Sequence, residues 1–239
     1  MPDVRAVAVA AMVIIGGGLA GYNGYRVWQP RQAPGGELTP PASAQSTAAD
    51  SGAVTDTQLA RGRVPAQVPD ITLPDLEGHP HSTREYLGHP LIINFWATWC
   101  DPCRREIPLL SQLLRSHRGE QLQIVGIAVD FKNAVSQYMA RTPLAYPVLI
   151  GEDQGMIAAE KFGMEPVLPF SVFSDASGRI VTVKVGELHP DEAELILETM
   201  RSAADGRASL QAARSRIAEG LQRLAIARAK NSVEAPPRH

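Results

Sequence analysis

The sequence contains two cysteines, Cys100 and Cys103, which lie three positions apart. A secreted protein stapled by disulfides would carry more cysteines, spread along the chain. Two cysteines cannot build a tetrahedral zinc site by themselves, and the six histidines show no paired ligand spacing near them. A structural disulfide closing so short a loop would restrict the unfolded chain little. The pair therefore favours thiol–disulfide redox chemistry.

The elements around this pair indicate which sulfur attacks. Residues 90–96 form a nearly continuous apolar run, typical of a strand covered on both faces, and apolar residues at helical spacing follow Cys103. Cys100 then lies at a helix N-terminus, where unpaired N–H groups and the helix dipole favour the thiolate. Cys103, one turn later, would resolve a mixed disulfide by attacking Cys100. Pro102 is acceptable in the first turn of the helix because N–H groups there have no helical partner.

The remaining patterns alternate between strand and helix. Strands are predicted at residues 70–77, 122–129, 146–150, 169–174 and 179–185, and helices at 133–141, 156–162 and 191–203. The turn Asp175-Ala-Ser-Gly178 predicts a hairpin between the last two strands. This order predicts an α/β domain, with a central mixed sheet flanked by helices.

The segment from Asn94 to Pro108, NFWATWCDPCRREIP, resembles the TlpA/ResA/DsbE branch of the thioredoxin superfamily. The resemblance extends from about residue 68 to 203 and includes the segments LPDLEGHPHS and LPFSVFSDASGRI. It implies a thioredoxin fold with an N-terminal β-hairpin extension. It also implies a membrane-anchored thiol–disulfide oxidoreductase with no cofactor other than the redox-active Cys100–Cys103 disulfide.

The same resemblance implies residues that contact the substrate. Pro169 stands where the family has a cis-proline facing the cysteines, and Leu168 would pair its backbone with an extended substrate. An ordinary trans-proline at a strand start is the alternative, with Pro166 as a rival position. Trp99, beside Cys100, either packs at the edge of the core or shapes the docking surface. Trp99, Pro102, Leu168 and Pro169 are the predicted substrate-binding residues.

Glu106 is the third predicted catalytic residue. It lies one helical turn after Cys103 and can point toward the cysteine side, although a solvated helix glutamate is the alternative. The matching family glutamate influences thiol ionisation. Asn94 departs from thioredoxin itself, which has a buried aspartate there, and an amide cannot accept the proton of the resolving thiol. Glu106 is therefore predicted to exchange that proton.

The resemblance also implies partners. A membrane thiol carrier of the DsbD/CcdA kind would supply electrons, and the chain would pass them to oxidised cysteines of extracytoplasmic proteins. Cytochrome c maturation is the leading pathway, but Leu-Pro-Phe-Ser replaces the Gly-x-Pro-Glu-Thr segment of dedicated members, which favours a general TlpA-like reductase. The rivals are a copper-handling thiol protein, a non-catalytic interaction module and, less favoured, a peroxidase.

Residues 1–29 are predicted to be a membrane anchor or a cleaved signal. Residues 6–25 carry no charge, and twenty helical residues span about 30 Å, enough to cross a bilayer. Residues 30–67, rich in proline and small polar residues, predict a flexible linker before a thioredoxin-like domain at 68–204. With the resemblance, this places the domain in the periplasm, anchored in the inner membrane of a Gram-negative bacterium.

Residues 205–239 predict a basic amphipathic helical tail. Its apolar stripe fits three alternatives, which are a helix packed on the domain, a dimer-forming helix and a basic helix on anionic lipid. The formal net charge of −2 and 5% aromatic residues argue against nucleic-acid binding.

Overall fold

A five-stranded mixed sheet forms the centre of the protein in a computed structural model that describes residues 64–165 and 167–234. The strand order is β5-β4-β3-β6-β7, with β3 parallel to β4 and antiparallel to β6. The strands are β3 (Leu91–Trp96), β4 (Gln123–Ala128), β5 (Val148–Ile150), β6 (Phe170–Ser174) and β7 (Ile180–Val185). The predicted mixed sheet with flanking helices is confirmed.

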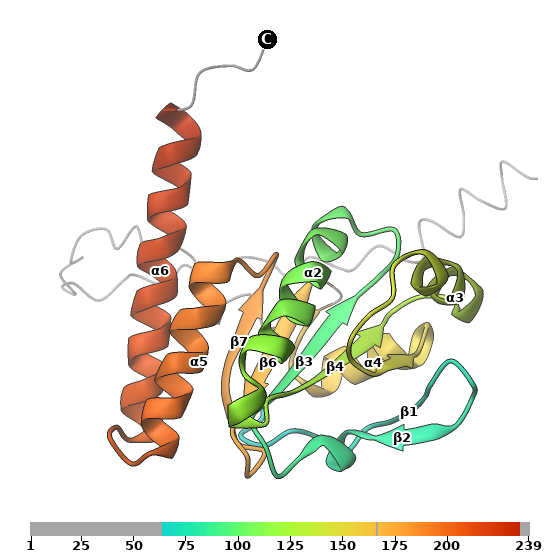
Figure 1. Cartoon of the computed structure of the whole chain (residues 1–239), viewed down its shortest axis with the longest axis horizontal. Helices are drawn as coiled ribbons and strands as arrows, with labels where there is room; N and C mark the ends of the chain where they lie inside the picture. Colours follow the sequence, from blue (N-terminus) through green and yellow to red (C-terminus); the bar gives the residue numbers. More distant parts are fainter. Residues whose placement is uncertain (1–63, 166, 235–239) are drawn as a thin grey trace, which may run out of the picture. The chain divides into compact units, whose positions relative to one another are not determined.

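Helices cover both faces of this sheet (Figure 1). The helices are α2 (Asp101–Ser116), α3 (Lys132–Arg141), α4 (Asp153–Lys161), α5 (Pro190–Ala204) and α6 (Leu210–Glu234), with short 3₁₀ turns η2 (Thr83–Tyr86) and η3 (Arg118–Glu120). Buried residues of α2, α3, α5 and α6 share one apolar cluster with one face of the sheet. Those of α4 and the N-terminal hairpin share a second cluster with the other face.

Strand β3 shows how the sequence sorts its side chains between these two clusters. Every residue of the strand is buried, as predicted for a strand covered on both faces. Ile93 and Phe95 join the cluster under α4, whereas Ile92 and Trp96 join the cluster under α2. Because successive side chains point to opposite faces, Asn94 lies between Ile92 and Trp96 on the α2 side.

The N-terminal hairpin pairs β1 (Thr72–Pro74) with β2 (Pro80–Ser82) in antiparallel fashion. Strand β1 is shorter than the predicted 70–77, because the Asp75 carboxylate accepts hydrogen bonds from the N–H groups of Gly78 and His79 and so closes a turn. Gly78 has a φ of 97°, a left-handed conformation that glycine adopts without strain. The other predicted strands and helices are present with boundary shifts of a few residues.

The C-terminal helix α6 packs along α5, which precedes it in the chain (Figure 1). Its residues Ala213, Ile217 and Leu221 are buried. The helices approach so closely that a Cβ added at Gly220 would lie 2.3 Å from a methyl group of Leu195. Of the three alternatives for the tail, the structure therefore shows a helix packed on the domain.

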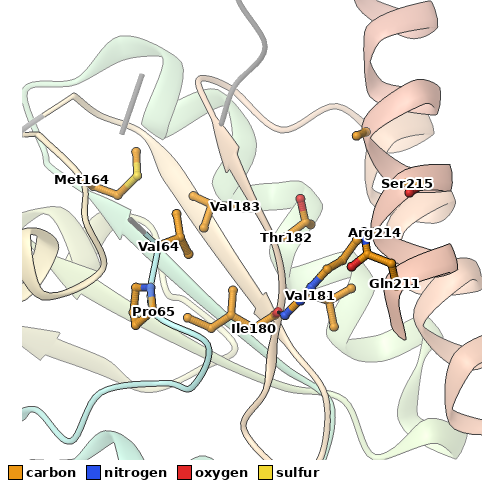
Figure 2. A pocket seen from close by; sticks show the side chains of 11 residues that line it. Val64, Pro65, Met164, Ile180, Val181, Thr182, Val183, Gln211, Arg214 and Ser215 are labelled. Atoms are coloured by element: carbon orange, nitrogen blue, oxygen red, sulfur yellow. Dashed lines mark hydrogen bonds between the residues drawn. The ribbon is translucent and has the colours of Figure 1, made fainter. Parts of the chain in front are cut away.

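Figure 2 shows a pocket of about 340 Å³ at the outer edge of β7. Val64 and Pro65 line one side of it, and Arg214 of α6 lies on the other side of the strand. The Arg214 guanidinium donates a hydrogen bond to the Ile180 carbonyl, 2.5 Å away. This pocket contains none of the predicted site residues.

The predicted membrane segment lies outside the described residues. Within residues 64–165 and 167–234, no helix combines the length and the apolar character needed to cross a bilayer.

His117 is buried at the end of α2, where its ring forms hydrogen bonds with the Ser116 hydroxyl and the Leu113 carbonyl. His117 is therefore a core residue and not a surface one.

Candidate active site

Cys100 and Cys103 form a disulfide at the start of α2, with their Cα atoms 5.3 Å apart. Cys100 is the N-cap residue, and its sulfur accepts a hydrogen bond from the Cys103 N–H at 3.3 Å. An N-cap residue normally has a side-chain oxygen that accepts hydrogen bonds from the first-turn N–H groups. Here the Cys100 sulfur takes the place of that oxygen. Pro102 lies in the first turn, where it interrupts no helical hydrogen bond.

The two sulfurs differ in accessibility. Cys103 is fully buried on the inner face of α2, whereas Cys100 retains 5% of its surface exposed. Next to Cys100, Trp99 is 67% exposed, so it lies on the surface and not in the core. Of the two cysteines, only Cys100 therefore retains any surface exposed to solvent.

Two further apolar side chains are exposed at the same end of the sheet. Phe131 follows β4 and Val167 precedes β6, and they are 61% and 45% exposed. The C-terminal ends of β3 and β4 and the start of β6 meet at this end, because β3 is parallel to β4 and antiparallel to β6. We refer to Trp99, Phe131 and Val167 as the apolar rim.

Asp130 ties two parts of this rim together. One carboxylate oxygen accepts from the N–H and hydroxyl of Thr98, at 2.9 and 2.6 Å, and the other accepts from the Phe131 N–H at 2.8 Å. Asp130 is itself buried. The loop before Cys100 and the loop after β4 are therefore held at a fixed spacing.

The Leu168–Pro169 peptide bond is cis, as the sequence resemblance implies, while Pro166 lies outside the described residues. Pro169 is buried at the start of β6, and Leu168 packs against the cluster that contains both cysteines. The Pro169 carbonyl accepts a hydrogen bond from the Gly186 N–H, which joins this turn to the end of β7.

Glu106 is buried beneath the cysteines and not solvated. One of its oxygens accepts from the Asn94 side-chain amide and the other from the Leu188 N–H, both at 2.7 Å. Burial raises the pKa of Glu106 to about 7, although these two hydrogen bonds and the charge of Lys184 act in the opposite direction. The carboxyl group can therefore gain or lose a proton near neutral pH.

Glu106 lies over a row of polar residues that crosses the sheet. Asn94 of β3 is paired with Ser171 of β6, and Ser171 is paired with Lys184 of β7. All of them are at least nine-tenths buried, and the Asn94 amide also donates to the Ser171 hydroxyl at 3.0 Å. We refer to Asn94, Glu106, Ser171 and Lys184 as the polar floor.

Sequence patterns alone did not identify Phe131, Asp130, Ser171 or Lys184. The signal for the last two was present, since Ser171 and Lys184 are polar residues at inward positions of mostly apolar strands. Asp130 lies two residues after the buried strand β4, in a loop, which is a frequent place for functional side chains. The structure brings Cys100, Cys103 and Glu106 together on α2 and places Leu168 against the same cluster.

No group of three or more histidine, cysteine or acidic side chains is arranged to hold a metal within residues 64–165 and 167–234.

The fold and the Cys-x-x-Cys pair at a strand-to-helix turn define a thioredoxin-like thiol–disulfide oxidoreductase. Residues 64–183 match the AhpC/TSA family model. The chain belongs to this family.

The individual relatives that the chain resembles are named as proteins of thiol–disulfide exchange. The thiol-disulfide oxidoreductase ResA of Geobacillus kaustophilus is 30% identical over 139 residues, which cover 58% of this chain and 78% of that protein. A crystal structure described as a thiol:disulfide interchange protein DsbE from Chlorobium tepidum is 25% identical, with a TM-score of 0.51 over 58% of this chain and 94% of that one. DsbF of MTB, in mixed oxidized and reduced forms, is 29% identical, with a TM-score of 0.50 over 57% and 98%.

Proposed function

We propose that this oxidoreductase acts as a reductant of disulfides in extracytoplasmic proteins, with Cys100 as nucleophile, Cys103 as resolving thiol and Glu106 as proton exchanger. The observation that carries the proposal is the buried carboxyl group of Glu106, which lies one turn beyond a fully buried Cys103. A thiol without access to water needs a nearby group to take its proton before it can attack.

The reaction begins from the dithiol form. The Cys100 thiolate attacks one sulfur of the substrate disulfide, and the substrate's other sulfur leaves as a thiolate that takes up a proton. The product of this step is a mixed disulfide between Cys100 and the substrate. The α2 N-terminus would stabilise the Cys100 thiolate before the attack, because the Cys103 N–H points at the sulfur and the helix dipole favours an anion there.

Resolution then requires Cys103 to lose its proton. The ionised Glu106 carboxylate accepts this proton, and the Cys103 thiolate attacks the Cys100 sulfur. The second substrate thiolate leaves, so two electrons have passed to the substrate and the Cys100–Cys103 disulfide has formed. A pKa of about 7 suits this task, since Glu106 is then ionised often enough to accept a proton and basic enough to hold it.

Trp99, Pro102, Leu168 and Pro169 would contact the substrate. The exposure of Trp99 supports this role, because an aromatic surface beside a nucleophile buries a large area on docking. Leu168 precedes the cis-proline and would pair its backbone with an extended substrate segment. The rim residues Phe131 and Val167 would enlarge the same docking surface.

The cellular setting follows from the N-terminal pattern. Residues 1–29 would anchor the chain in the inner membrane of a Gram-negative bacterium, and residues 30–67 would link the anchor to a periplasmic domain. A membrane thiol carrier of the DsbD/CcdA kind would return electrons to the Cys100–Cys103 disulfide. Oxidised cysteines of apocytochrome c are the leading substrate within the broader class of protein disulfides.

The decisive experiment uses Cys103→Ser in cells. Without the resolving thiol, the mixed disulfide with Cys100 cannot be released, so covalent complexes should accumulate on non-reducing gels and can be identified by mass spectrometry. Cys100→Ser is the matched control and should form none. The absence of trapped partners in Cys103→Ser, together with equally slow alkylation of both thiols in the reduced wild type, would refute the proposal.

A further inference from the structure

We propose that the C-terminal helix α6 tunes the proton chemistry of the active site. Its residue Arg228 compensates the negative charge of Glu192, which would otherwise oppose the effect of Lys184 on the ionisation of Glu106. This inference rests on the proposed role of Glu106 as proton exchanger. Arg228, Glu192 and Lys184 are positioning residues in this scheme, since none of them touches the reacting sulfurs.

The first link is the polar floor, which runs from beneath α2 to the edge of the sheet. Asn94 donates one hydrogen bond to Glu106 and another to Ser171. Lys184 is the cross-strand neighbour of Ser171 on β7, and its ammonium lies close enough to lower the pKa of Glu106. The row thus connects the carboxyl group with a cation that is only 7% exposed.

The second link joins this cation to the helical layer. The Lys184 ammonium donates to the Val185 carbonyl at 2.5 Å and lies 3.8 Å from a carboxylate oxygen of Glu192. Glu192 lies in the first turn of α5 and is 2% exposed. The Lys184 ammonium therefore acts electrostatically on two buried carboxyl groups, those of Glu106 and Glu192.

The third link is Arg228, near the end of α6. Its guanidinium donates to the other Glu192 oxygen at 2.7 Å and to an Asp191 oxygen at 2.7 Å. Figure 1 shows α6 running antiparallel to α5 and extending past the start of α5. The two hydrogen bonds of Arg228 join this part of α6 to the first turn of α5. Arg228 thereby pairs with one Glu192 oxygen while Lys184 lies nearer the other.

The coupling has a definite sign. With Arg228 present, the negative charge of Glu192 is compensated and opposes ionisation of Glu106 less. Without Arg228, the network gains one uncompensated negative charge, which disfavours ionisation of Glu106. Buried charges interact through a low effective dielectric, so a change one residue removed can still reach Glu106.

Other groups also face Glu106, and they come from each packed element. Glu187 raises its pKa and is itself paired with Arg105 on the surface of α2. Tyr146, which precedes β5, lies near enough to feel the charge of Glu106. Cys103 of α2, Asn94 of β3 and the Leu188 N–H complete the surroundings. None of these groups belongs to α6, so their effects remain when Arg228 is changed.

Helix α6 lies outside the region shared with the family, since the family model covers residues 64–183. The match ends before Lys184, so Lys184, α5 and α6 all lie beyond it. The inference predicts that α6 adjusts the site in addition to stabilising the fold.

The test is a titration of the Glu106 carboxyl carbon by NMR in the oxidised full-length chain, in which no thiol titrates. Lys184→Met should raise the midpoint by on the order of one pH unit, and Arg228→Gln by a few tenths. Glu192→Gln should lower the midpoint, and the double variant Arg228→Gln/Glu192→Gln should return it close to the wild-type value. A general loosening of the fold would not produce opposite signs that cancel in the double variant.

Arg223→Gln is the matched control, because it removes the same charge from the same helix at an exposed pair with Glu219. The control should leave the midpoint unchanged. An unchanged midpoint in Arg228→Gln, or a shift equal to that of Arg223→Gln, would overturn the inference. The two proposals fail separately: an unaltered pH profile of disulfide reduction in Glu106→Gln would remove the proposed role of Glu106, whatever Arg228 does to the titration.

Discussion

The apolar rim and the polar floor invert the usual distribution of residues between surface and core. Trp99, Phe131 and Val167 are apolar and exposed, whereas Glu106 and Lys184 are ionisable and buried. Exposed apolar groups and buried charges both cost free energy in the isolated protein. In the proposed mechanism the two regions have separate tasks, since the rim would dock the partner and the floor would exchange the proton.

This division matches the order of the proposed reaction. The rim acts in the first step, when Cys100 meets a substrate from solvent. The floor acts in the second step, when the buried Cys103 must give up its proton. Substitutions in the two regions should therefore affect different measurements.

The largest loss of activity should come from substitution of Cys100, which takes part in both steps of the proposed reaction. Cys100→Ser should abolish disulfide reduction, with a loss of at least about a thousandfold, because a hydroxyl is hardly ionised at neutral pH and cannot form the mixed disulfide. The assay is reduction of a protein disulfide by the pre-reduced enzyme. Thermal unfolding serves as the control for folding. Residual activity of one tenth or more would place the nucleophile elsewhere.

The rim should set affinity for protein substrates. Trp99→Ala should lower kcat/KM for a protein disulfide by about tenfold, since an exposed aromatic anchor commonly contributes 1–2 kcal/mol to binding. Reduction of a small aromatic disulfide should change much less, because it buries little of the rim. The pH midpoint of the reaction should stay in place. Equal losses with large and small substrates would show that Trp99 supports the site and not the docking.

The floor should set the pH dependence. Glu106→Gln should remove the ionisation near pH 7 from the rate of mixed-disulfide resolution and slow that step, because an amide cannot accept the Cys103 proton. The variant should fold, since a rotation of the Asn94 amide would turn its unpaired carbonyl oxygen toward the new amide. A pH profile identical to the wild type would contradict this prediction.

The unfolding free energy should depend on pH through the same carboxyl group, which gives an independent test. Its pKa rises from the ordinary 4.5 to about 7 on folding, so the folded chain holds the proton more tightly than the unfolded chain. The wild type should therefore lose about 3 kcal/mol of unfolding free energy from this group as the pH rises from 4.5 through 7. Glu106→Gln should lack this loss, which urea unfolding of the oxidised proteins at pH 5 and pH 8 would measure.

The smallest effect is expected at Ser171. Ser171→Ala removes one of the two acceptors of the Asn94 amide and should cost about 1 kcal/mol of stability. Turnover on a small disulfide should stay near wild type, because the Asn94 hydrogen bond to Glu106 remains. A large loss of activity with unchanged stability would give Ser171 a direct part in proton transfer.

Much of the fold could be predicted from the sequence because its signals are local. The apolar run before Trp96 and the helical spacing after Cys103 each depend on neighbouring residues, and both elements were predicted close to their observed bounds. The first strand was predicted too long, because the pattern does not show that the Asp75 side chain closes a turn. For the tail, local spacing fits a packed, a dimeric and a lipid-bound helix equally well.

The sequence by itself determined the reacting pair, its place before a helix and the alternation of strands and helices, since these follow from residue types within a few positions of one another. Only the tertiary structure decided that Glu106 is buried against Asn94 and Leu188, and that Arg228 meets Glu192. These contacts join residues from different elements, far apart along the chain in every case but the first. Their free energies depend on burial and distance, which no local pattern contains.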